Sequence, residues 1–279
     1  MLRGLVAAVL VGIICGVVGC FIILRGLALM GDALSHAVLP GVAIAFMLGI
    51  NFFIGAVVTG ILTALAIGFV TQNSRVKEDS AIGIMFTAAF ALGIILITQI
   101  HSVSVDLPHI LFGDVLGVST TDLWLTGGTG LVVLLGVILF YKELLLTSFD
   151  PTMAAAIGLP NRLIHYFLMV LLSLVTVASL QTVGIVLVVA MLITPGATAY
   201  LLTDRLSVML GLAALFGVVS SVVGLYVSYY VENIPSGATI VVTATVLFLL
   251  ALLFSPKQGL VWRRLRKARR THDASEPAA

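Results

Sequence analysis

Nine apolar stretches of about 20 residues follow one another along this chain of 279 residues, and no other feature constrains its fold as strongly. A helix of about 20 apolar residues is long enough to cross the roughly 30 Å hydrocarbon core of a bilayer. The stretches are continuous and rich in Gly and Ala, whereas strands of a membrane barrel alternate apolar and polar residues. The sequence therefore predicts an all-α, polytopic membrane protein with about nine transmembrane helices. The expected spans are 5–24, 27–49, 52–71, 81–100, 122–141, 163–180, 183–202, 207–231 and 238–254.

The composition excludes several classes of protein. Hydrophobic residues make up 61% of the chain and charged residues 9%, against roughly 45–50% and 25% in soluble domains. A soluble fold of this length could not hide so much apolar surface in one core. These values exclude an ordinary soluble enzyme, a disordered protein and a nucleic-acid binder with a broad basic face. Within the first span, Gly12 and Gly16 form a G-x-x-x-G pattern, which predicts close helix packing.

The few basic residues lie mostly between the spans and indicate the orientation of the chain. With nine spans, the basic loops and the C-terminal tail fall on one side, and only Arg3 falls on the other. Because basic loops stay in the cytoplasm, we expect an external N-terminus and an internal C-terminus. The chain then divides into a transmembrane domain at 1–254 and a basic cytoplasmic tail at 255–279, partly disordered. The tail holds seven of the fourteen basic residues, and we expect it to contact membrane lipid and not nucleic acid.

One acidic residue lies inside a predicted span. Eleven of the twelve acids lie in loops, at span edges or in the tail, and the exception is Asp32. His36 follows four positions later, so both side chains share one helix face. A carboxylate inside a membrane costs several kcal/mol or more unless it meets a partner, water or a metal. Carboxylate oxygen and imidazole nitrogen are ligands for divalent first-row metals such as Mn²⁺, Zn²⁺ and Fe²⁺. The pair predicts a cation site.

Two structural interpretations of Asp32 remain open beside the cation site. It could form a plain hydrogen bond with His36, or it could cap a helix that begins at Ala33. Ser35 and the following Pro40 favour a functional site, because a proline frees a backbone carbonyl. Broken helices at membrane depth are tolerated where they line a cavity. We therefore expect Ser35 and Pro40 to line a pathway or form a hinge.

Two further groups of residues have two interpretations each. A second broken span is expected at Thr194 and Pro195, as a simple kink or as a second pore-lining helix. Asp106 and His109, in the loop at 101–120, and Glu232 are candidates for an external mouth that guides a cation. A solvated loop explains Asp106 and His109 at least as well, and an ordinary turn at 235–237 explains the cluster beside Glu232.

The segment at 149–160 has the clearest local pattern in the chain. Asp150 is a good N-cap, and Pro151 suits the first helical position. Gly158 predicts the end of a helix that is too short to be stable alone in water. Met153 and Ile157, four residues apart, offer an apolar surface, to lipid or, as we expect, to a partner subunit. The chain lacks the G-x-x-x-x-G-K-[ST] pattern, so any ATP that powers it is bound by another polypeptide.

Six segments in order resemble the metal-uptake permeases of ABC transporters, the manganese/zinc/iron family. The strongest match surrounds Asp32 and His36, and Gly196 departs from the alanine that many members have after the proline. The matching segments are 31–41, 77–83, 111–117, 148–151, 183–199 and 235–240.

The resemblance implies the fold of the vitamin B12 and siderophore ABC importer permeases and a location in the bacterial plasma membrane. It implies a homodimer with two cytosolic ATPase subunits and an extracytoplasmic solute-binding protein. Asp32 and His36 would coordinate the cation, and the segment at 150–158 would be the coupling helix. The chain would be a non-catalytic subunit without a permanent cofactor, with manganese as the first candidate for the transported ion and zinc or iron as alternatives. The alternative is a proton-coupled secondary metal transporter in which Asp32 and His36 relay protons.

Overall fold

The computed structural model describes residues 1–99, 115–231 and 234–255. Within these residues every regular element is helical, and nine helices are long and apolar enough to cross a membrane. One of the nine is a broken pair, α2 and α3. The all-α fold class and the number of spans are therefore confirmed for the described part of the chain. The spans are α1 (Leu2–Arg25), α2 (Ala28–Ala37) with α3 (Leu39–Leu48), α4 (Phe52–Asn73), α5 (Glu78–Thr98), α7 (Thr120–Leu139), α10 (Asn161–Val183), α11 (Ile185–Leu202), α12 (Leu206–Tyr230) and α13 (Ser236–Phe254).

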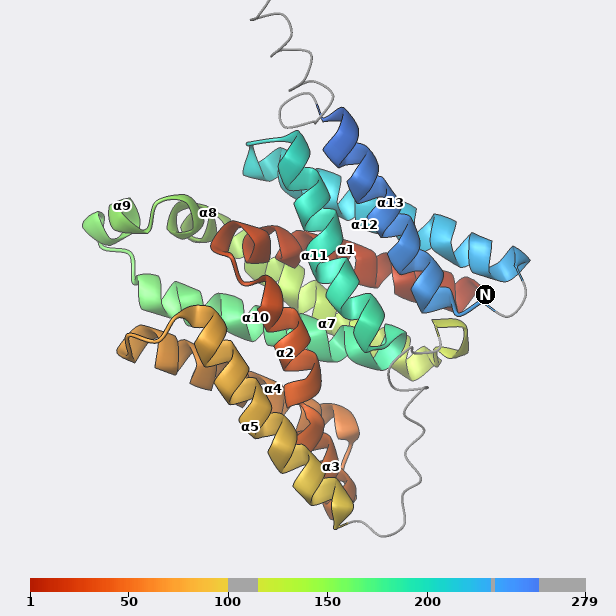
Figure 1. Ribbon diagram of the computed structural model, residues 1–279, viewed down its shortest axis with the longest axis horizontal. Coiled ribbons are helices and arrows are strands. Elements are labelled where there is room, and N and C mark those ends of the chain that lie inside the picture. Colours follow the sequence, from red (N-terminus) through yellow and green to blue (C-terminus); the bar gives the residue numbers. More distant parts are fainter. Residues whose placement is uncertain (100–114, 232–233, 256–279) are drawn as a thin grey trace, which may run out of the picture.

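The helices form two groups that meet along α1 and α10. Helix α1 packs against α11, α12 and α7, and α13 packs on α11 and α12. Helices α2 to α5 form the second group, which extends away from α13 in Figure 1. Helix α10 joins the groups, because it contacts α4 on one side and α7 on the other. The main apolar core follows α1, α10 and α11.

Small residues let α1 and α12 approach closely. A Cβ atom on Gly12 would lie 2.7 Å from the carbonyl oxygen of Gly217, and one on Gly16 would lie 2.8 Å from that of Ala213. Across the same interface, the Ser221 hydroxyl donates to a carbonyl oxygen of α1 at 2.9 Å. The packing role predicted for Gly12 and Gly16 is therefore confirmed. Contacts of this kind hold helices together in lipid, where the hydrophobic effect between helices is weak.

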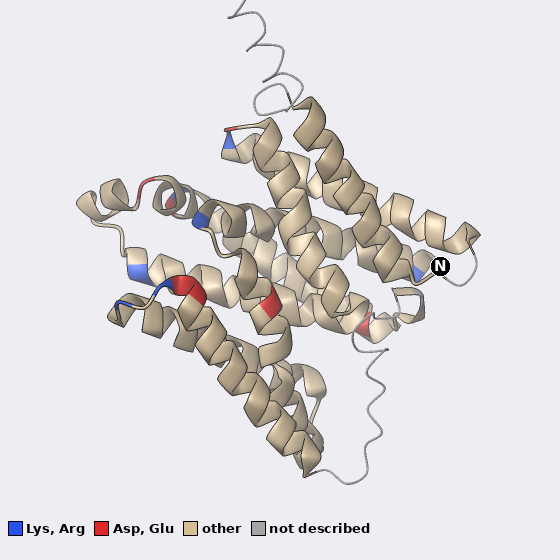
Figure 2. Cartoon of the chain, viewed as in Figure 1, with Lys and Arg blue, Asp and Glu red and all other residues tan. Residues whose placement is uncertain are grey.

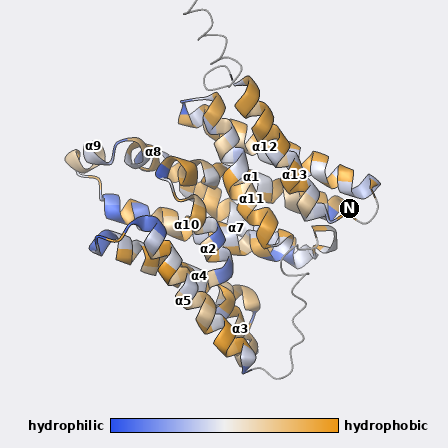
Figure 3. Cartoon of the chain, in the orientation of Figure 1, coloured by the Kyte–Doolittle hydropathy of each residue, from blue (hydrophilic) through white to orange (hydrophobic). Residues whose placement is uncertain are grey.

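Polar and apolar regions separate along the molecule. Charged residues gather mainly around α9, the loop between α4 and α5 and the first turn of α10 (Figure 2). The central parts of the helices are largely apolar (Figure 3). This polar end is the one that the basic loops assign to the cytoplasm. Of the predicted tail at 255–279, only Ser255 lies within the described residues, where its hydroxyl donates to the Leu201 carbonyl oxygen at 2.6 Å.

Three shorter helical elements connect the spans. They are η1 (Val115–Gly117), α8 (Tyr141–Phe149) and α9 (Pro151–Ala156). The sequence did not indicate α8 as a separate helix, because neither proline nor glycine separates it from α7. The chain turns at Phe140, where φ is −101° and ψ is 24°. Helix α5 begins three residues before the expected span, so that Glu78 and Asp79 lie in its first turn. Acidic residues in a first turn stabilise the helix through its dipole.

Candidate functional site

Helix α2 places Asp32 and His36 on one face, as the sequence predicts. The His36 Nε2 atom lies 3.7 Å from the Asp32 Oδ1 atom, which is too long for a hydrogen bond. The helix begins at Ala28, with Leu27 as its N-cap, so Asp32 lies in the helix interior. The interpretation of Asp32 as an N-cap is therefore wrong. The side chains are 52% exposed for Asp32 and 27% exposed for His36, and both are accessible to an ion.

Two aromatic rings of α5 hold the His36 imidazole. The ring centroid of Phe86 lies 5.8 Å from that of His36, and the Phe90 centroid lies 5.7 Å away with its ring edge-on. Distances and angles of this kind are those of favourable ring pairs. The contacts limit the rotation of the imidazole while its Nε2 atom faces Asp32.

The span that carries the pair is interrupted at Val38, two residues after His36. Helix α2 ends at Ala37, and α3 begins at Leu39 with Pro40 in its first turn. Pro40 is buried, and a Cβ on Gly41 would collide with the Gly55 carbonyl oxygen of α4. The break expected at Pro40 is present, because the proline starts a new helix that packs tightly on α4.

A cavity of about 420 Å³ opens beside His36. Ser35 lines it and donates its hydroxyl hydrogen to the Gly31 carbonyl oxygen at 2.9 Å, so the oxygen keeps its lone pairs for the cavity. Asp122, in the first turn of α7, lines the same cavity. Its carboxylate and the Ser119 hydroxyl form a capping box. The cavity therefore brings together polar groups from α2 and α7. Further lining residues come from α3, α5, α10 and α11, including Leu39, Phe90, Gln181, Thr182 and Ile185.

The second candidate functional segment is α9. Asp150 caps it, because its Oδ1 atom accepts hydrogen bonds from the Met153 amide at 2.9 Å and from the Thr152 hydroxyl at 2.6 Å. These hydrogen bonds hold the pKa of the Asp150 carboxyl below its usual value. The cap therefore stabilises α9 above the ordinary pKa of the carboxyl and weakens only when the pH falls through the lowered value.

The C-terminal end of α9 is capped by Gly158, as the sequence predicts. The apolar side chains of Met153 and Ile157 are exposed. Gly158 adopts a left-handed conformation with φ of 84°, and its amide donates to the Ala155 carbonyl oxygen at 3.0 Å. The side chains of Met153 and Ile157 are 53% and 58% exposed. The segment at 150–158 therefore presents an uncovered apolar surface at the polar end of the molecule.

Comparison with known proteins identifies the family. The family model described as the ABC 3 transport family matches residues 1–255. This chain belongs to the ABC 3 transport family. The manganese transport system membrane protein MntC of Halalkalibacterium halodurans is 70% identical over 267 residues, which cover 96% of this chain and 91% of MntC. As a member of this family, the chain is a multi-pass protein of the bacterial plasma membrane and a transport component, and the resemblance noted in the sequence is confirmed.

Solved structures agree with this membership. A chain in the structure of PsaBC from Streptococcus pneumoniae in complex with Fab superimposes with a TM-score of 0.81 and 52% sequence identity, covering 92% of each chain. An inward-facing structure of the metal-chelate type of ABC transporter superimposes with a TM-score of 0.68 at 19% identity, covering 90% of this chain and 85% of the other. The second likeness concerns the fold alone and agrees with the all-helical fold expected from the sequence.

In this member of the ABC 3 family, α11 is a single helix, whereas α2 and α3 are two helices within one span. Helix α11 is continuous from Ile185 to Leu202, with Pro195 inside it, so the span is not divided into two helices there, and a simple kink at Pro195 stays open. The Thr198 hydroxyl donates to the Thr194 carbonyl oxygen at 2.7 Å. Pro195 is buried and Thr194 is half-buried, and neither lines the cavity beside His36. A pore-lining or hinge role for these two residues stays a prediction.

Three predicted site residues have no description in the structure, and one residue that lines the cavity was not predicted. Asp106, His109 and Glu232, expected at an external mouth, lie outside the described residues. The sequence interpretation missed Asp122 as a lining residue. The signal was present, because a serine followed three residues later by an acid before an apolar run is a capping-box pattern. What the pattern could not show is that this helix start borders the cavity beside His36.

Proposed function

We propose that this chain is the membrane-spanning permease subunit of an ABC importer for divalent transition metals, with manganese as the first candidate cargo. The observation that carries the proposal is the Asp32–His36 pair on a span that is interrupted two residues after it. The relative named a manganese transport system membrane protein supports manganese as the cargo. Zinc and iron(II) remain alternative cargoes, because carboxylate and imidazole bind all three ions.

The pair acts as a transient site for its cargo. An ionised Asp32 and a neutral His36 each supply one ligand atom, and the ion draws the two atoms together from 3.7 Å apart. Two ligands from one chain leave other coordination positions for water or for a second copy of the chain. Asp32 is the more exposed of the two side chains, so a second copy in a homodimer has access to it. Ser35 and Pro40 would line the pathway beside the site.

Energy for transport would come from a separate cytosolic ATPase subunit that docks on α9. The exposed Met153 and Ile157 support this docking surface, and the capped, short helix supplies a rigid contact. In the proposed assembly, two copies of the permease bind two ATPase subunits, and an extracytoplasmic solute-binding protein delivers the metal. The permease itself hydrolyses nothing, and the transported ion is its cargo and not a resident cofactor.

Metal uptake by site variants tests the proposal. In bacterial cells that lack other manganese importers, Asp32→Asn and His36→Ala should each reduce manganese uptake by at least about tenfold, because loss even of outer-shell groups at metal sites costs 10- to 100-fold. Asp79→Asn is the matched control, since Asp79 is an exposed acid in the first turn of α5. Normal uptake in either site variant would contradict the site.

The proton-coupled alternative makes a different prediction for the energy source. In proteoliposomes, uptake by the proposed importer should require the ATPase subunit and ATP and should persist when a proton ionophore collapses the gradient. Uptake by the permease alone, driven by an imposed proton gradient, would favour the secondary transporter and contradict an ABC importer. Copurification of an ATPase subunit with the permease is the simplest first measurement.

A further inference from the structure

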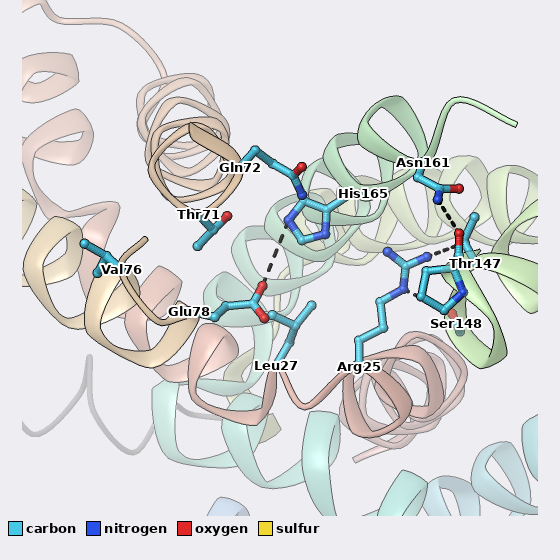
Figure 4. A pocket seen from close by; sticks show the side chains of 11 residues that line it. Arg25, Leu27, Thr71, Gln72, Val76, Glu78, Thr147, Ser148, Asn161 and His165 are labelled. Atoms are coloured by element: carbon cyan, nitrogen blue, oxygen red, sulfur yellow. Dashed lines mark hydrogen bonds and ion pairs between the residues drawn. The ribbon is translucent and has the colours of Figure 1, made fainter. Parts of the chain in front are cut away.

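The side chain of Arg25 lies between two segments that matter for the proposed function. One is α9, the proposed ATPase contact, and the other is α2, which carries the candidate metal site. Arg25 is the last residue of α1. Its Nε atom donates to the Ser148 hydroxyl at 3.1 Å, and its Nη2 atom donates to the Thr147 hydroxyl at 2.5 Å. Figure 4 shows the guanidinium reaching from α1 towards these two residues at the end of α8. Both contacts join residues more than 120 positions apart in the chain.

On the far side of this contact, the chain leads directly into α9. Ser148 is separated by one residue from Asp150, the N-cap of α9. The Thr147 hydroxyl itself donates to the Glu143 carbonyl oxygen at 2.8 Å, which fixes its lone pairs towards Arg25. The start of α9 is also held from α10, because the Asn161 side-chain amide donates to the Pro151 carbonyl oxygen at 2.7 Å.

On the near side, a short turn leads from Arg25 into the helix that holds the candidate metal ligands. Gly26 is left-handed with φ of 73°, and the amide of Leu27 donates to the Ile22 carbonyl oxygen at 2.9 Å. Leu27 is buried, at 1% exposure, and is the N-cap of α2. The turn is therefore compact and anchored, so a displacement of Arg25 moves the start of α2 with it.

A pocket of about 430 Å³ gives these segments room to move. Arg25, Thr147 and Ser148 line it, together with Pro151 and Asn161. Residues of α4, α5 and α10 also line it, and there the Glu78 carboxylate lies 4.0 Å from His165 Nε2 (Figure 4). Because close-packed interiors resist displacement, an open pocket at the junction of α1, α8 and α9 is where a relative shift meets least resistance.

We propose that Arg25 is a positioning residue that transmits the displacement of α9 to α2. The inference rests on the proposed function, because it takes α9 as the ATPase contact and Asp32 with His36 as the metal site. A guanidinium suits this role, since its planar fork directs two donors to two acceptors at once and fixes their geometry. A lysine in its place has a single flexible ammonium group. The hydrogen bonds to Thr147 and Ser148 therefore act as the link between ATP hydrolysis and metal release.

The test measures transport and ATP hydrolysis on the same preparation. The full complex of permease, ATPase subunit and binding protein is reconstituted in proteoliposomes, and manganese transported per ATP hydrolysed is determined. Arg25→Gln should keep ATP hydrolysis within about twofold of the wild type while the transport ratio falls about tenfold, within the range of measured coupling between sites. Arg75→Gln is the matched control, because Arg75 is exposed in the loop between α4 and α5 at the same polar end.

A second variant tests the contact from its other side and covers failure of the first to assemble. Thr147→Val combined with Ser148→Ala removes both acceptors and should lower the ratio to the same extent. Adding Arg25→Gln to this variant should cause a smaller loss than Arg25→Gln causes alone, since the three residues share one contact and their effects are not additive. Equal losses of transport and hydrolysis, or an unchanged ratio, would overturn the inference. Absence of manganese, zinc and iron transport by the wild-type complex would instead overturn the proposed function.

Discussion

At the scale of single residues, the orientation of His36 depends on side chains that belong to another helix. Phe86 and Phe90 are one turn apart on α5, and both rings lie within 6 Å of the imidazole centroid. They also contact each other, with centroids 5.9 Å apart. The His36 imidazole and its two aromatic neighbours therefore form one packed group. Metal sites depend on such neighbours because the neighbours fix how a ligand presents its nitrogen.

We expect Phe86→Ala and Phe90→Ala each to weaken manganese binding to the permease by about tenfold, because outer-shell changes at metal sites cost 10- to 100-fold. Isothermal titration calorimetry with the purified complex measures the dissociation constant. Ile84→Ala is the control, since Ile84 lies on the same helix but is 61% exposed and has no ring contact. Unchanged affinity in both phenylalanine variants would show that His36 does not need this support.

At the scale of helices, the contact of α1 with α11 depends on glycines whose backbones nearly touch. A Cβ on Gly196 would lie 2.9 Å from the carbonyl carbon of Gly19, and one on Gly19 would collide with the Leu192 carbonyl oxygen. The close approach to Gly19 explains why a glycine fits at position 196. The contacts of Leu192 and Gly196 with Gly19 lie on both sides of Pro195 in the sequence.

Gly19→Ala should therefore destabilise the permease by about 1–3 kcal/mol, the usual cost of adding an atom to a packed contact. Gly211→Ala is the matched control in α12, because no atom lies within 4 Å of its added Cβ. Thermal unfolding of the two variants in detergent compares them. A melting temperature for Gly19→Ala equal to that of the control would mean that α1 and α11 separate readily.

Some of these helical elements could be predicted from the sequence and others could not. The spans, the break at Pro40 and the short α9 were predictable, because bilayer thickness, proline geometry and capping act through local sequence. The continuity of α11 through Pro195 was not, since a proline signals a lost hydrogen bond but not the packing that compensates for it. The pair Asp32 and His36 stood out because charges are rare in this chain. Its aromatic neighbours did not, because they come from a helix 50 residues later in the sequence.

At the scale of the whole molecule, the candidate metal site and the uncovered surface of α9 belong to one connected structure. Helix α9 follows α8, α8 contacts Arg25, and Arg25 leads into α2. Nothing in the described part of the chain covers Met153 and Ile157, which is consistent with the proposed contact between α9 and an ATPase subunit. Among the large apolar side chains of this short helix and its C-cap, these two are each more than half exposed.

Replacing both side chains tests whether they hold the partner. We expect Met153→Ser with Ile157→Ser to weaken binding of the ATPase subunit by about tenfold, since burial of their exposed halves contributes roughly 1–2 kcal/mol. Copurification and titration of the ATPase subunit against the permease measure the loss. Val208→Ser is the control, because Val208 is 45% exposed in the first turn of α12. If the double variant retained the ATPase while the control behaved as the wild type, α9 would rest on lipid and the docking surface would lie elsewhere.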